Sequence, residues 1–179
     1  MSGAGLPIYW NPLPHSGAMV KIDRGGGVTV YCGTTDIGQD SDSMLAYIVS
    51  EVLGIEPIDV HVLTGDTDLS PVDLGSYSSR VTFMAGNAAR TAAEKLRELL
   101  VTVAADALDV PQDQLSLGNR FVYDTSDTDR RLSFVDAVNK AEALFGISSQ
   151  PGITLRRSWG VTTRAQVWGR RLRIASRRP

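Results

Sequence analysis

Two short loops rich in glycine and small polar residues carry the side chains best suited to chemistry in this chain. The first is GTTDIGQD, residues 33–40, and the second is GSYSS, residues 75–79. Each precedes a run with helical spacing, so unpaired backbone N–H groups and the positive end of a helix dipole would face a ligand there. Such helix starts bind anions, and glycine lets a phosphate approach the main chain closely. Two of them, about 40 residues apart, suggest a site for one large phosphorylated cofactor.

The polar side chains of these loops can bind a ligand without adding positive charge. Gln39 offers an amide donor and an amide acceptor, which suits the edge of a pterin or an oxo group. Ser76, Ser78 and Ser79 offer hydroxyls beside free backbone amides, as phosphate oxygens require. The plainer interpretation is that Gln39 is a solvated loop residue and that Ser78 or Ser79 caps the following helix. Arg80 either supplies a cation to the same anion or faces solvent.

No other cluster of residues predicts a catalytic or metal site. Asp66, Asp68 and Asp73 lie close together but lack the spacing and the terminal glutamate of a calcium loop, so we interpret them as turn-forming residues. His15 and His61 have no ligand-spaced partners and give no basis for a Ser-His-Asp triad. Neither GxGxxG nor GxxxxGKS/T occurs, so no motif supports a Rossmann or P-loop interpretation.

Patterns of apolar residues predict the elements that position the first loop. Two short β-prone runs, 18–23 and 28–32, flank a glycine-rich turn and predict a hairpin. Apolar residues at 45–53 recur with helical spacing, and Gly54 follows where that helix would end. Alternation over 58–64 then predicts a strand. Together these elements form a β-α-β passage.

Two further helices are predicted downstream. The longer spans about 81–108, with alanines crowding its first half and larger apolar residues in its second half. The small residues permit close packing on another backbone. A third helix is predicted over 133–144, with Ser133 as its cap. No internal repeat or low-complexity tract occurs before residue 150.

The two loops and their spacing resemble the molybdenum-cofactor-binding large subunit of the xanthine dehydrogenase family, and within it most closely the 4-hydroxybenzoyl-CoA reductase-like members. The resemblance runs over residues 2–150, from SGAGLPIYWNPLPHSG through both loops and the helix that follows. It implies an α/β (α+β) fold with a mixed sheet and helices, as part of the molybdopterin-binding domain. It also implies that the chain is a fragment, because the family subunit is several times longer.

The resemblance further implies which residues contact the cofactor. The family residue that matches Gln39 lies beside the molybdenum site, and its loop, with Gly38, contacts the cofactor. The acidic catalytic residue of the family belongs to a region C-terminal to this stretch, so we expect neither a catalytic residue nor a metal ligand here. The family segment that matches the second loop wraps the pterin and its pyrophosphate, which adds Gly75, Ser76, Tyr77, Ser78 and Ser79 as cofactor-binding residues.

Asp40 departs from the family pattern, in which a glycine completes a GQG triplet. If that glycine adopts a positive φ, an aspartate there costs roughly 1–2 kcal/mol. A carboxylate ~5 Å from one unit of cofactor charge would oppose binding by roughly 3 kcal/mol at an effective dielectric constant of about 20. Alternatively, Asp40 turns away and caps a helix that starts near Ser41. The departure leaves open whether this copy binds a functional cofactor.

The resemblance also implies the reaction and partners of the complete enzyme. Its cofactor would be molybdenum–molybdopterin, with or without a cytosine nucleotide, and the protein would hold and orient it. Iron–sulfur clusters and FAD on partner subunits would carry electrons. The substrate would be an aromatic CoA thioester that loses a ring hydroxyl, or an aromatic or aldehyde compound that is hydroxylated. We expect this chain alone to be inactive.

Composition and cysteine usage narrow the class of protein. A length of 179 residues with 42% hydrophobic content predicts about one domain. Cys32 is the only cysteine, which excludes an intrachain disulfide and an iron–sulfur ligand set. The N-terminus has no basic segment followed by a long apolar one, and no run approaches ~18 apolar residues. We therefore predict a cytoplasmic protein without a signal peptide or membrane span.

The charge distribution divides the chain at residue 153. All 20 acidic residues lie in 1–153, the family-like part, whereas 154–179 carries eight arginines and no acid. Arginine is seldom buried unpaired, so this tail is not expected to complete the core. It is a disordered solvated end, an out-of-frame translation product, or a basic arm in which Trp159 and Trp168 stack on nucleic acid bases. The rival to an enzyme fragment is thus a degenerate, non-enzymatic fragment or a nucleic-acid-binding module, and nucleic acid is the partner we favour least.

Overall fold

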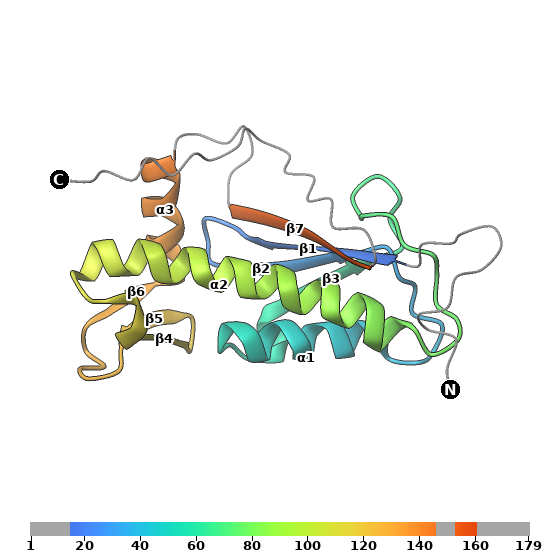
Figure 1. Ribbon diagram of the computed structural model, residues 1–179, viewed down its shortest axis with the longest axis horizontal. Coiled ribbons are helices and arrows are strands. Elements are labelled where there is room, and N and C mark those ends of the chain that lie inside the picture. Colours follow the sequence, from blue (N-terminus) through green and yellow to red (C-terminus); the bar gives the residue numbers. More distant parts are fainter. Residues whose placement is uncertain (1–14, 146–152, 161–179) are drawn as a thin grey trace.

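The computed structural model describes residues 15–145 and 153–160. Within these ranges the chain forms a four-stranded mixed sheet and a separate three-stranded antiparallel sheet, connected by helices (Figure 1). The α/β (α+β) class with a mixed sheet, expected from the sequence, is confirmed. The larger sheet has the order β3-β2-β1-β7, and its strands are β1 (His15–Ile22), β2 (Val28–Cys32), β3 (Val60–Thr64) and β7 (Ile153–Gly160).

The predicted hairpin is confirmed, because β1 and β2 pair antiparallel. Two backbone hydrogen bonds close its turn: the Asp23 N–H donates to the Gly27 carbonyl at 3.0 Å, and the Gly26 N–H donates to the Asp23 carbonyl at 2.9 Å. From β2 the chain passes through α1 (Ser41–Leu53) to β3, which pairs parallel with β2. The predicted β-α-β passage is therefore confirmed.

The helix α1 follows the spacing of its apolar residues. Leu45, Val49 and Leu53 lie four positions apart and are fully buried, so they form one stripe toward the sheet. Gly54 then takes a φ of 65°, and its N–H donates to the Ser50 carbonyl. This left-handed conformation costs glycine little and ends the helix where the sequence predicts.

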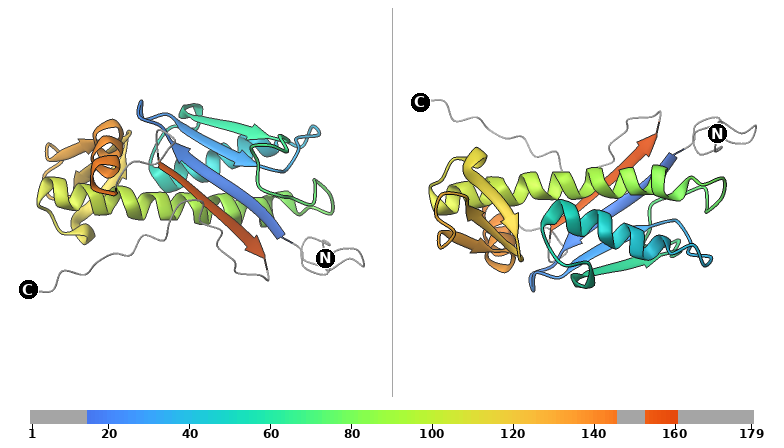
Figure 2. Two further views of the ribbon diagram at one scale, coloured as in Figure 1. Left: turned by 90° about the horizontal axis from the view of Figure 1, so that it is seen from above. Right: turned by 90° about the horizontal axis from the view of Figure 1, so that it is seen from below.

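The long helix predicted over 81–108 is confirmed, although its first turn is a π-helix, η3 (Val81–Ala85), that continues into α2 (Gly86–Leu108). Gly86 permits a close approach of α1, because a Cβ on it would lie 2.9 Å from Cδ1 of Ile48. Both helices lie on the same face of the larger sheet (Figure 2). The buried face of α2 has the expected change from small to larger side chains: Ala88, Ala89, Ala92, Ala93, Leu96, Leu100 and Val103.

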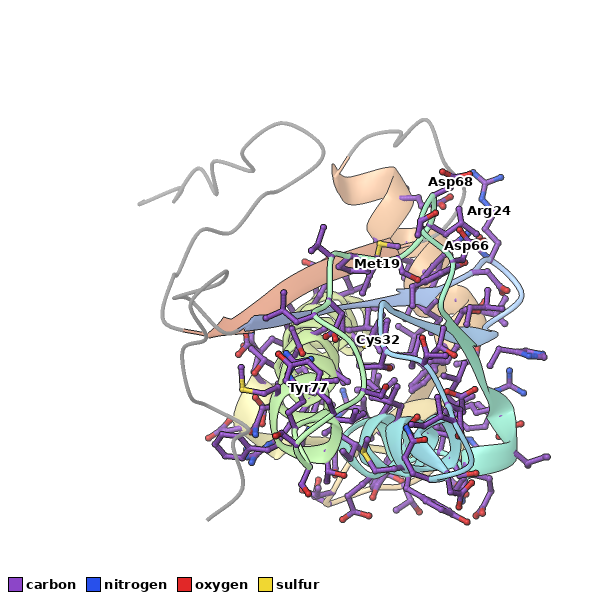
Figure 3. The ribbon with its side chains drawn as sticks, turned by 90° about the vertical axis from the view of Figure 1, so that its right-hand side faces the viewer. Met19, Arg24, Cys32, Asp66, Asp68 and Tyr77 are labelled. Atoms are coloured by element: carbon purple, nitrogen blue, oxygen red, sulfur yellow. The ribbon has the colours of Figure 1, made fainter. Side chains whose placement is uncertain are left out.

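Side chains alternate between the two faces of the larger sheet. On β2, Val28, Val30 and Cys32 are buried against the helices, whereas Tyr31 is half-buried on the opposite face. Met19 also lies on the face away from the helices, as Figure 3 shows. Burial raises the pKa of the Cys32 thiol. A large part of the hydrophobic core therefore lies between the larger sheet and the two helices.

A second sheet, not expected from the sequence, lies beside the C-terminal half of α2 (Figure 1). Its strands have only three or four residues, and alternation over so few positions cannot be told from a turn. The three strands pair antiparallel in sequence order. They are β4 (Leu115–Gly118), β5 (Phe121–Asp124) and β6 (Arg131–Ser133).

The predicted third helix is confirmed as α3 (Phe134–Phe145). Ser133 caps it as expected: its hydroxyl accepts a hydrogen bond from the Asp136 N–H at 3.1 Å and donates to the Asp136 carboxylate at 2.6 Å. Two single 3₁₀ turns precede β3 and β4, namely η2 (Pro57–Asp59) and η4 (Gln112–Gln114).

The arginine-rich segment begins inside the larger sheet. β7 pairs antiparallel with β1 along eight residues, from Ile153 opposite Ile22 to Gly160 opposite His15. The first part of 154–179 is therefore a paired strand. Residues 161–179 lie outside the described residues, where the disordered or out-of-frame tail stays a prediction. Among the residues that the structure does describe, none of the helices has the length and apolar character to cross a bilayer; the cytoplasmic location also stays a prediction.

Candidate functional site

The two loops singled out in the sequence lie side by side at one end of the larger sheet (Figure 1). The Ser76 hydroxyl donates to the Thr35 carbonyl at 2.6 Å and accepts from the Thr35 N–H at 3.1 Å. The two loops, expected to serve one cofactor, therefore converge. Between them lies a cavity of about 370 Å³, lined by Ile37, Gln39, Ser76, Tyr77, Ser78, Ser79, Arg80, Val81 and Thr82.

Asp36 shapes the first loop. One carboxylate oxygen accepts a hydrogen bond from the Gly38 N–H at 2.8 Å, and the other accepts from the Asp42 N–H at 3.4 Å. The Gly38 hydrogen bond is the main cause that lowers the pKa of Asp36. Gly38 itself has a φ of 96°, and a Cβ on it would meet no atom within 4 Å. Its backbone is thus open to an approaching ligand, although Gly38 is not among the lining residues.

Gln39 lines the cavity, but its amide group is engaged by its own loop and by the first residue of α1. The Oε1 atom accepts from the Ile37 N–H at 2.6 Å. The Nε2 atom donates to the Thr35 carbonyl at 3.1 Å and to the Ser41 hydroxyl at 2.9 Å. Both amide donors are thus used, and only acceptor capacity remains. Gln39 can donate a hydrogen bond to a cofactor only after it leaves one of these partners.

Asp40 occupies the left-handed region, with φ 61° and ψ 35°, and is the N-cap residue of α1. A glycine would adopt this conformation without strain. The positive φ that was considered for the glycine of the family's GQG triplet is therefore present here. The Ser43 hydroxyl donates to the Asp40 carboxylate at 2.6 Å. Asp40 is not among the residues that line the cavity. Of the two alternatives, the geometry favours the one in which Asp40 turns away from the ligand, but the Asp40 carboxylate makes no capping hydrogen bond to α1.

Residues 71–73, which lead into the second loop, pack against two glycines: Gly17 in β1 and Gly33 at the start of the first loop. A Cβ on Gly33 would lie 2.4 Å from the Pro71 carbonyl oxygen and 2.8 Å from Cβ of Asp73. A Cβ on Gly17 would lie 2.5 Å from Cβ of Pro71. Any larger side chain at either position would push residues 71–73 outward, because packed interiors leave no spare volume. These contacts fix where the second loop starts.

Arg80 is a buried residue among those that line the cavity. Its side chain is 1% exposed, so the alternative in which it faces solvent is wrong. The guanidinium donates to the Asp73 carboxylate at 2.7 Å and to the Gly75 carbonyl at 2.8 Å. Because Asp73 balances its charge, Arg80 does not present an uncompensated cation to an anion.

Ser78 and Ser79 are exposed and have unusual backbone conformations. Their φ values are 52° and 54°, whereas Arg80 has a φ of −89°. A left-handed residue followed by a right-handed one turns successive backbone N–H groups toward one side, an arrangement that binds anions. Tyr77 and Ile37 add apolar surface at the rim and are 38% and 73% exposed.

The lining fits an anionic ligand that carries a ring system. It offers hydroxyl and backbone N–H donors, and no carboxylate stands among the lining residues that the structure describes. The volume lies in the range of about 300–1,000 Å³ found for small-molecule sites. Phosphate oxygens can be accommodated at Ser78 and Ser79, and a planar ring can contact Tyr77. The residues present are therefore suited to a phosphorylated pterin.

The aspartates outside the cavity form turns. Asp66 accepts a hydrogen bond from the Asp68 N–H at 2.9 Å, and Asp73 accepts one from the Gly75 N–H at 2.8 Å. The turn-forming role predicted for Asp66 and Asp73 is confirmed. Asp66 and Asp68 lie well away from Tyr77 (Figure 3). In the described ranges, no three His, Cys, Asp or Glu side chains are grouped as a metal ion would require.

Several residues of the site were not identified from the sequence. Ile37 and Thr82 line the cavity, and Thr35 joins the loops through its main chain. An apolar residue inside an otherwise polar loop was an available signal for Ile37. Nothing in the side-chain type of Thr35 reveals a role that its backbone performs.

The chain is thus an α/β domain in which a β-α-β unit brings two polar loops together at one end. Residues 1–169 match the family model described as "Molybdopterin cofactor-binding domain". The chain belongs to this family, within the molybdenum oxidoreductases related to xanthine dehydrogenase and CO dehydrogenase. The match extends beyond residue 150, where the sequence resemblance was expected to stop.

Individual relatives agree with this assignment. The chain is 35% identical over 152 residues to a probable hypoxanthine oxidase of Escherichia coli K12, covering 85% of this chain and 15% of that protein. It is 37% identical over 136 residues to the 6-hydroxypseudooxynicotine dehydrogenase complex subunit gamma of Paenarthrobacter nicotinovorans, covering 76% of this chain and 16% of that protein. Its structure is similar to reconstituted CO dehydrogenase from Oligotropha carboxidovorans, with a TM-score of 0.73 and 26% identity. The match covers 88% of this chain and 20% of that chain.

Proposed function

We propose that the two loops hold the pterin and phosphate parts of a molybdenum cofactor within a larger oxidoreductase. The observation that supports this most directly is the cavity between the two loops, which the Ser76–Thr35 hydrogen bonds join to each other. The chain spans about 15% of the length of the curated relatives reported above, so the activity, substrate and partners of the whole protein are part of the proposal.

The residues divide into two groups in this proposal. Ser78 and Ser79 donate to phosphate oxygens, and the Tyr77 ring contacts the pterin. Gly38, Gln39, Gly75 and Ser76 contribute mainly through the backbone and through the shape of the loops. The engaged amide of Gln39 and the engaged hydroxyl of Ser76 support this division.

The bound group would supply the redox chemistry at molybdenum, and this chain would orient it and shield it from water. The cofactor is molybdopterin or its cytosine dinucleotide. Iron–sulfur clusters and FAD on partner subunits would complete electron transfer, which is consistent with a relative named as one subunit of a dehydrogenase complex. None of the described residues is assigned a catalytic role, and we expect the isolated chain to be inactive.

For the substrate of the complete enzyme, we propose an aromatic compound, with hydroxylation of a heteroaromatic ring as the reaction. Two relatives are named for hypoxanthine and for 6-hydroxypseudooxynicotine, both heteroaromatic. An aromatic CoA thioester, as in 4-hydroxybenzoyl-CoA reductase, rests on the sequence resemblance alone. A substrate screen of the complete enzyme that includes hypoxanthine, a pyridine and 4-hydroxybenzoyl-CoA would separate these possibilities.

The cofactor assignment is tested by retention of molybdopterin. The chain is mixed anaerobically with molybdopterin released from a denatured molybdoenzyme, and the pterin that survives desalting is measured by fluorescence after oxidation. A carboxylate placed at Ser78 or Ser79 within ~5 Å of the phosphate would oppose binding by roughly 3 kcal/mol, more than a hundredfold in affinity. Wild-type protein should therefore retain pterin, whereas Ser79→Asp should not.

The matched control is Thr67→Asp, which adds the same charge to an exposed turn between Asp66 and Asp68, away from Tyr77 (Figure 3). This variant should retain pterin as the wild type does. Equal retention by Ser79→Asp and Thr67→Asp would show that the phosphate does not bind at the second loop, and the proposal would then be wrong.

A further inference from the structure

Arg80 makes several contacts around the base of the second loop. Its guanidinium donates to the Asp73 carboxylate at 2.7 Å, to the Gly75 carbonyl at 2.8 Å and to the Ser16 hydroxyl at 3.0 Å. The side chains of Arg80 and Asp73 are 1% and 0% exposed. One buried side chain thus ties the second loop to strand β1.

Asp73 and Arg80 together hold both polar groups of Gly75. The Gly75 N–H donates to the Asp73 carboxylate at 2.8 Å, while the Gly75 carbonyl accepts from Arg80. Gly75 has a φ of 101°, a conformation that L residues rarely adopt. Its orientation is therefore set from both sides by one ion pair.

The part of the loop that follows needs such support. Ser78 and Ser79 both lie in the left-handed region, which costs a residue with a side chain free energy at each position. Unfavourable conformations of this kind persist only where surrounding contacts determine them. The Tyr77 ring, with its centroid 5.4 Å from the Arg80 guanidinium carbon, is a further contact of the same side chain.

We propose that Arg80 is a positioning residue: it holds the second loop so that Ser78 and Ser79 present their donors to the anion, and it does not bind that anion itself. The purpose of this role, anion binding, rests on the proposed function. The positioning of the loop is a property of the free chain. Burial and pairing with Asp73 leave the guanidinium oriented toward the protein. The anion would then be recognised by neutral hydroxyl and N–H groups.

Lysine cannot reproduce these contacts. The guanidinium is a planar fork whose separate nitrogens reach different acceptors: one reaches Asp73 and Gly75, and the other reaches Ser16. A single ammonium group keeps the charge beside Asp73 but cannot reach both sides. The Arg80→Lys variant therefore separates loop geometry from charge.

The test is amide hydrogen exchange in the free 179-residue chain, read residue by residue by NMR. In Arg80→Lys, the amides of Gly75, Arg80 and Thr35 should exchange at least about tenfold faster, since all three are bonded within or to the second loop. The amides of Val30 and Leu100, in the core, should be unchanged. Arg90→Lys, which alters the exposed Arg90–Glu94 pair, is the matched control and should change none of these rates.

Inorganic pyrophosphate, titrated into the same samples, tests the consequence for binding. Its affinity should fall at least about tenfold in Arg80→Lys and stay unchanged in Arg90→Lys. The Arg80 guanidinium resonances of the wild type should shift less on titration than the Ser78 and Ser79 amides.

Two results would overturn the positioning role. Faster exchange at Val30 and Leu100, to the same extent as at Gly75, would mean that Arg80 only supports global stability. Unchanged exchange in the loop, with Arg80 resonances that shift most on titration, would mean that Arg80 binds the anion directly. If wild-type protein binds no pyrophosphate, the proposed function is undermined, but the exchange rates still decide the role of Arg80.

Discussion

The Ser76 hydroxyl forms two hydrogen bonds with the main chain of Thr35, donating to its carbonyl at 2.6 Å and accepting from its N–H at 3.1 Å. The Ser76 side chain thus pairs with both backbone groups of Thr35, as the main chain of a neighbouring strand would. A serine hydroxyl has one proton to donate, and that proton is already used. Ser76 is therefore suited to holding the two loops together more than to donating to a ligand.

Replacing Ser76 with alanine should loosen the connection between the loops. Two hydrogen bonds worth about 0.5–1.5 kcal/mol each are lost, but solvent reaches this site, so we expect a loss of about 1 kcal/mol in the free energy of unfolding. Urea denaturation measures this loss. Ser78→Ala, whose hydroxyl lies in an exposed part of the same loop, is the control and should change stability by less than about 0.5 kcal/mol. Equal effects of the two variants would contradict the role given to Ser76.

Gly33→Ala should displace the second loop. Its new Cβ would lie 2.4 Å from the Pro71 carbonyl oxygen, and neither backbone can yield without moving its neighbours. Overpacking of this kind costs typically about 1–3 kcal/mol, which chemical denaturation would detect. Gly25→Ala is the control, because its nearest contact is the end of the Asp23 side chain at 3.2 Å. A Gly33→Ala variant as stable as Gly25→Ala would show that the loop adapts.

Asp36 should make stability depend on pH. Its pKa is lowered in the folded state, chiefly by the Gly38 N–H, so the ionised carboxylate stabilises the fold above the unfolded pKa of about 3.9. That contribution is lost as the pH falls through the lower folded pKa. The stability difference between wild type and Asp36→Asn should therefore be largest near about pH 7 and should shrink toward about pH 2. A difference that stays constant over this range would argue against an ionised Asp36 as the organiser of the loop.

Asp40→Gly should have little effect on anion binding. The Asp40 carboxylate accepts from Ser43 at 2.6 Å and is not among the residues lining the cavity. We expect pyrophosphate affinity within about twofold of wild type, in contrast to the more than hundredfold gain that removing a carboxylate ~5 Å from the ligand would give. In the stability of the fold, relief of the left-handed strain at residue 40, roughly 1–2 kcal/mol, is offset by the lost Ser43 contact and by the greater backbone freedom of glycine. An affinity gain of tenfold or more would show that Asp40 faces the ligand.

The hairpin, the β-α-β passage and the long helix could be predicted because their signals are local. Leu45, Val49 and Leu53 share a helix face through their spacing alone, and Gly54 ends that helix through its own conformational freedom. That the two loops serve one cofactor was suggested by their shared composition and by the family resemblance. The three short strands of the second sheet were missed because β4, β5 and β6 are defined by pairing with one another, and pairing partners cannot be read from three or four residues.

Some features of the site could not be predicted from the sequence, and the burial of Arg80 is one that depends on contacts distant in sequence. The burial of Arg80 could not be predicted, since it depends on Asp73 and Ser16 meeting it, and Ser16 lies 64 positions away. Gln39 differs in that its partners are close in sequence: it was expected to offer its amide to a ligand, yet Thr35, Ile37 and Ser41 already occupy that amide. Side-chain type shows what a residue is able to bind, whereas its partners are fixed by the fold.

Removing the chain after Gly152 should destabilise the protein. β7 covers the edge of β1 along eight residues, from Ile153 to Gly160, and its loss would leave the backbone donors and acceptors of that edge of β1 unpaired. We expect the thermal midpoint to fall by more than about 5 °C, and 5 °C corresponds to roughly 1.3–2.5 kcal/mol for a chain of this size. Truncation after Gly160 keeps the strand and should change the midpoint by no more than a degree or two. If both truncated chains unfold at the temperature of the full chain, β7 contributes no stability, and the out-of-frame origin considered for residues 154–179 becomes the better explanation of that segment.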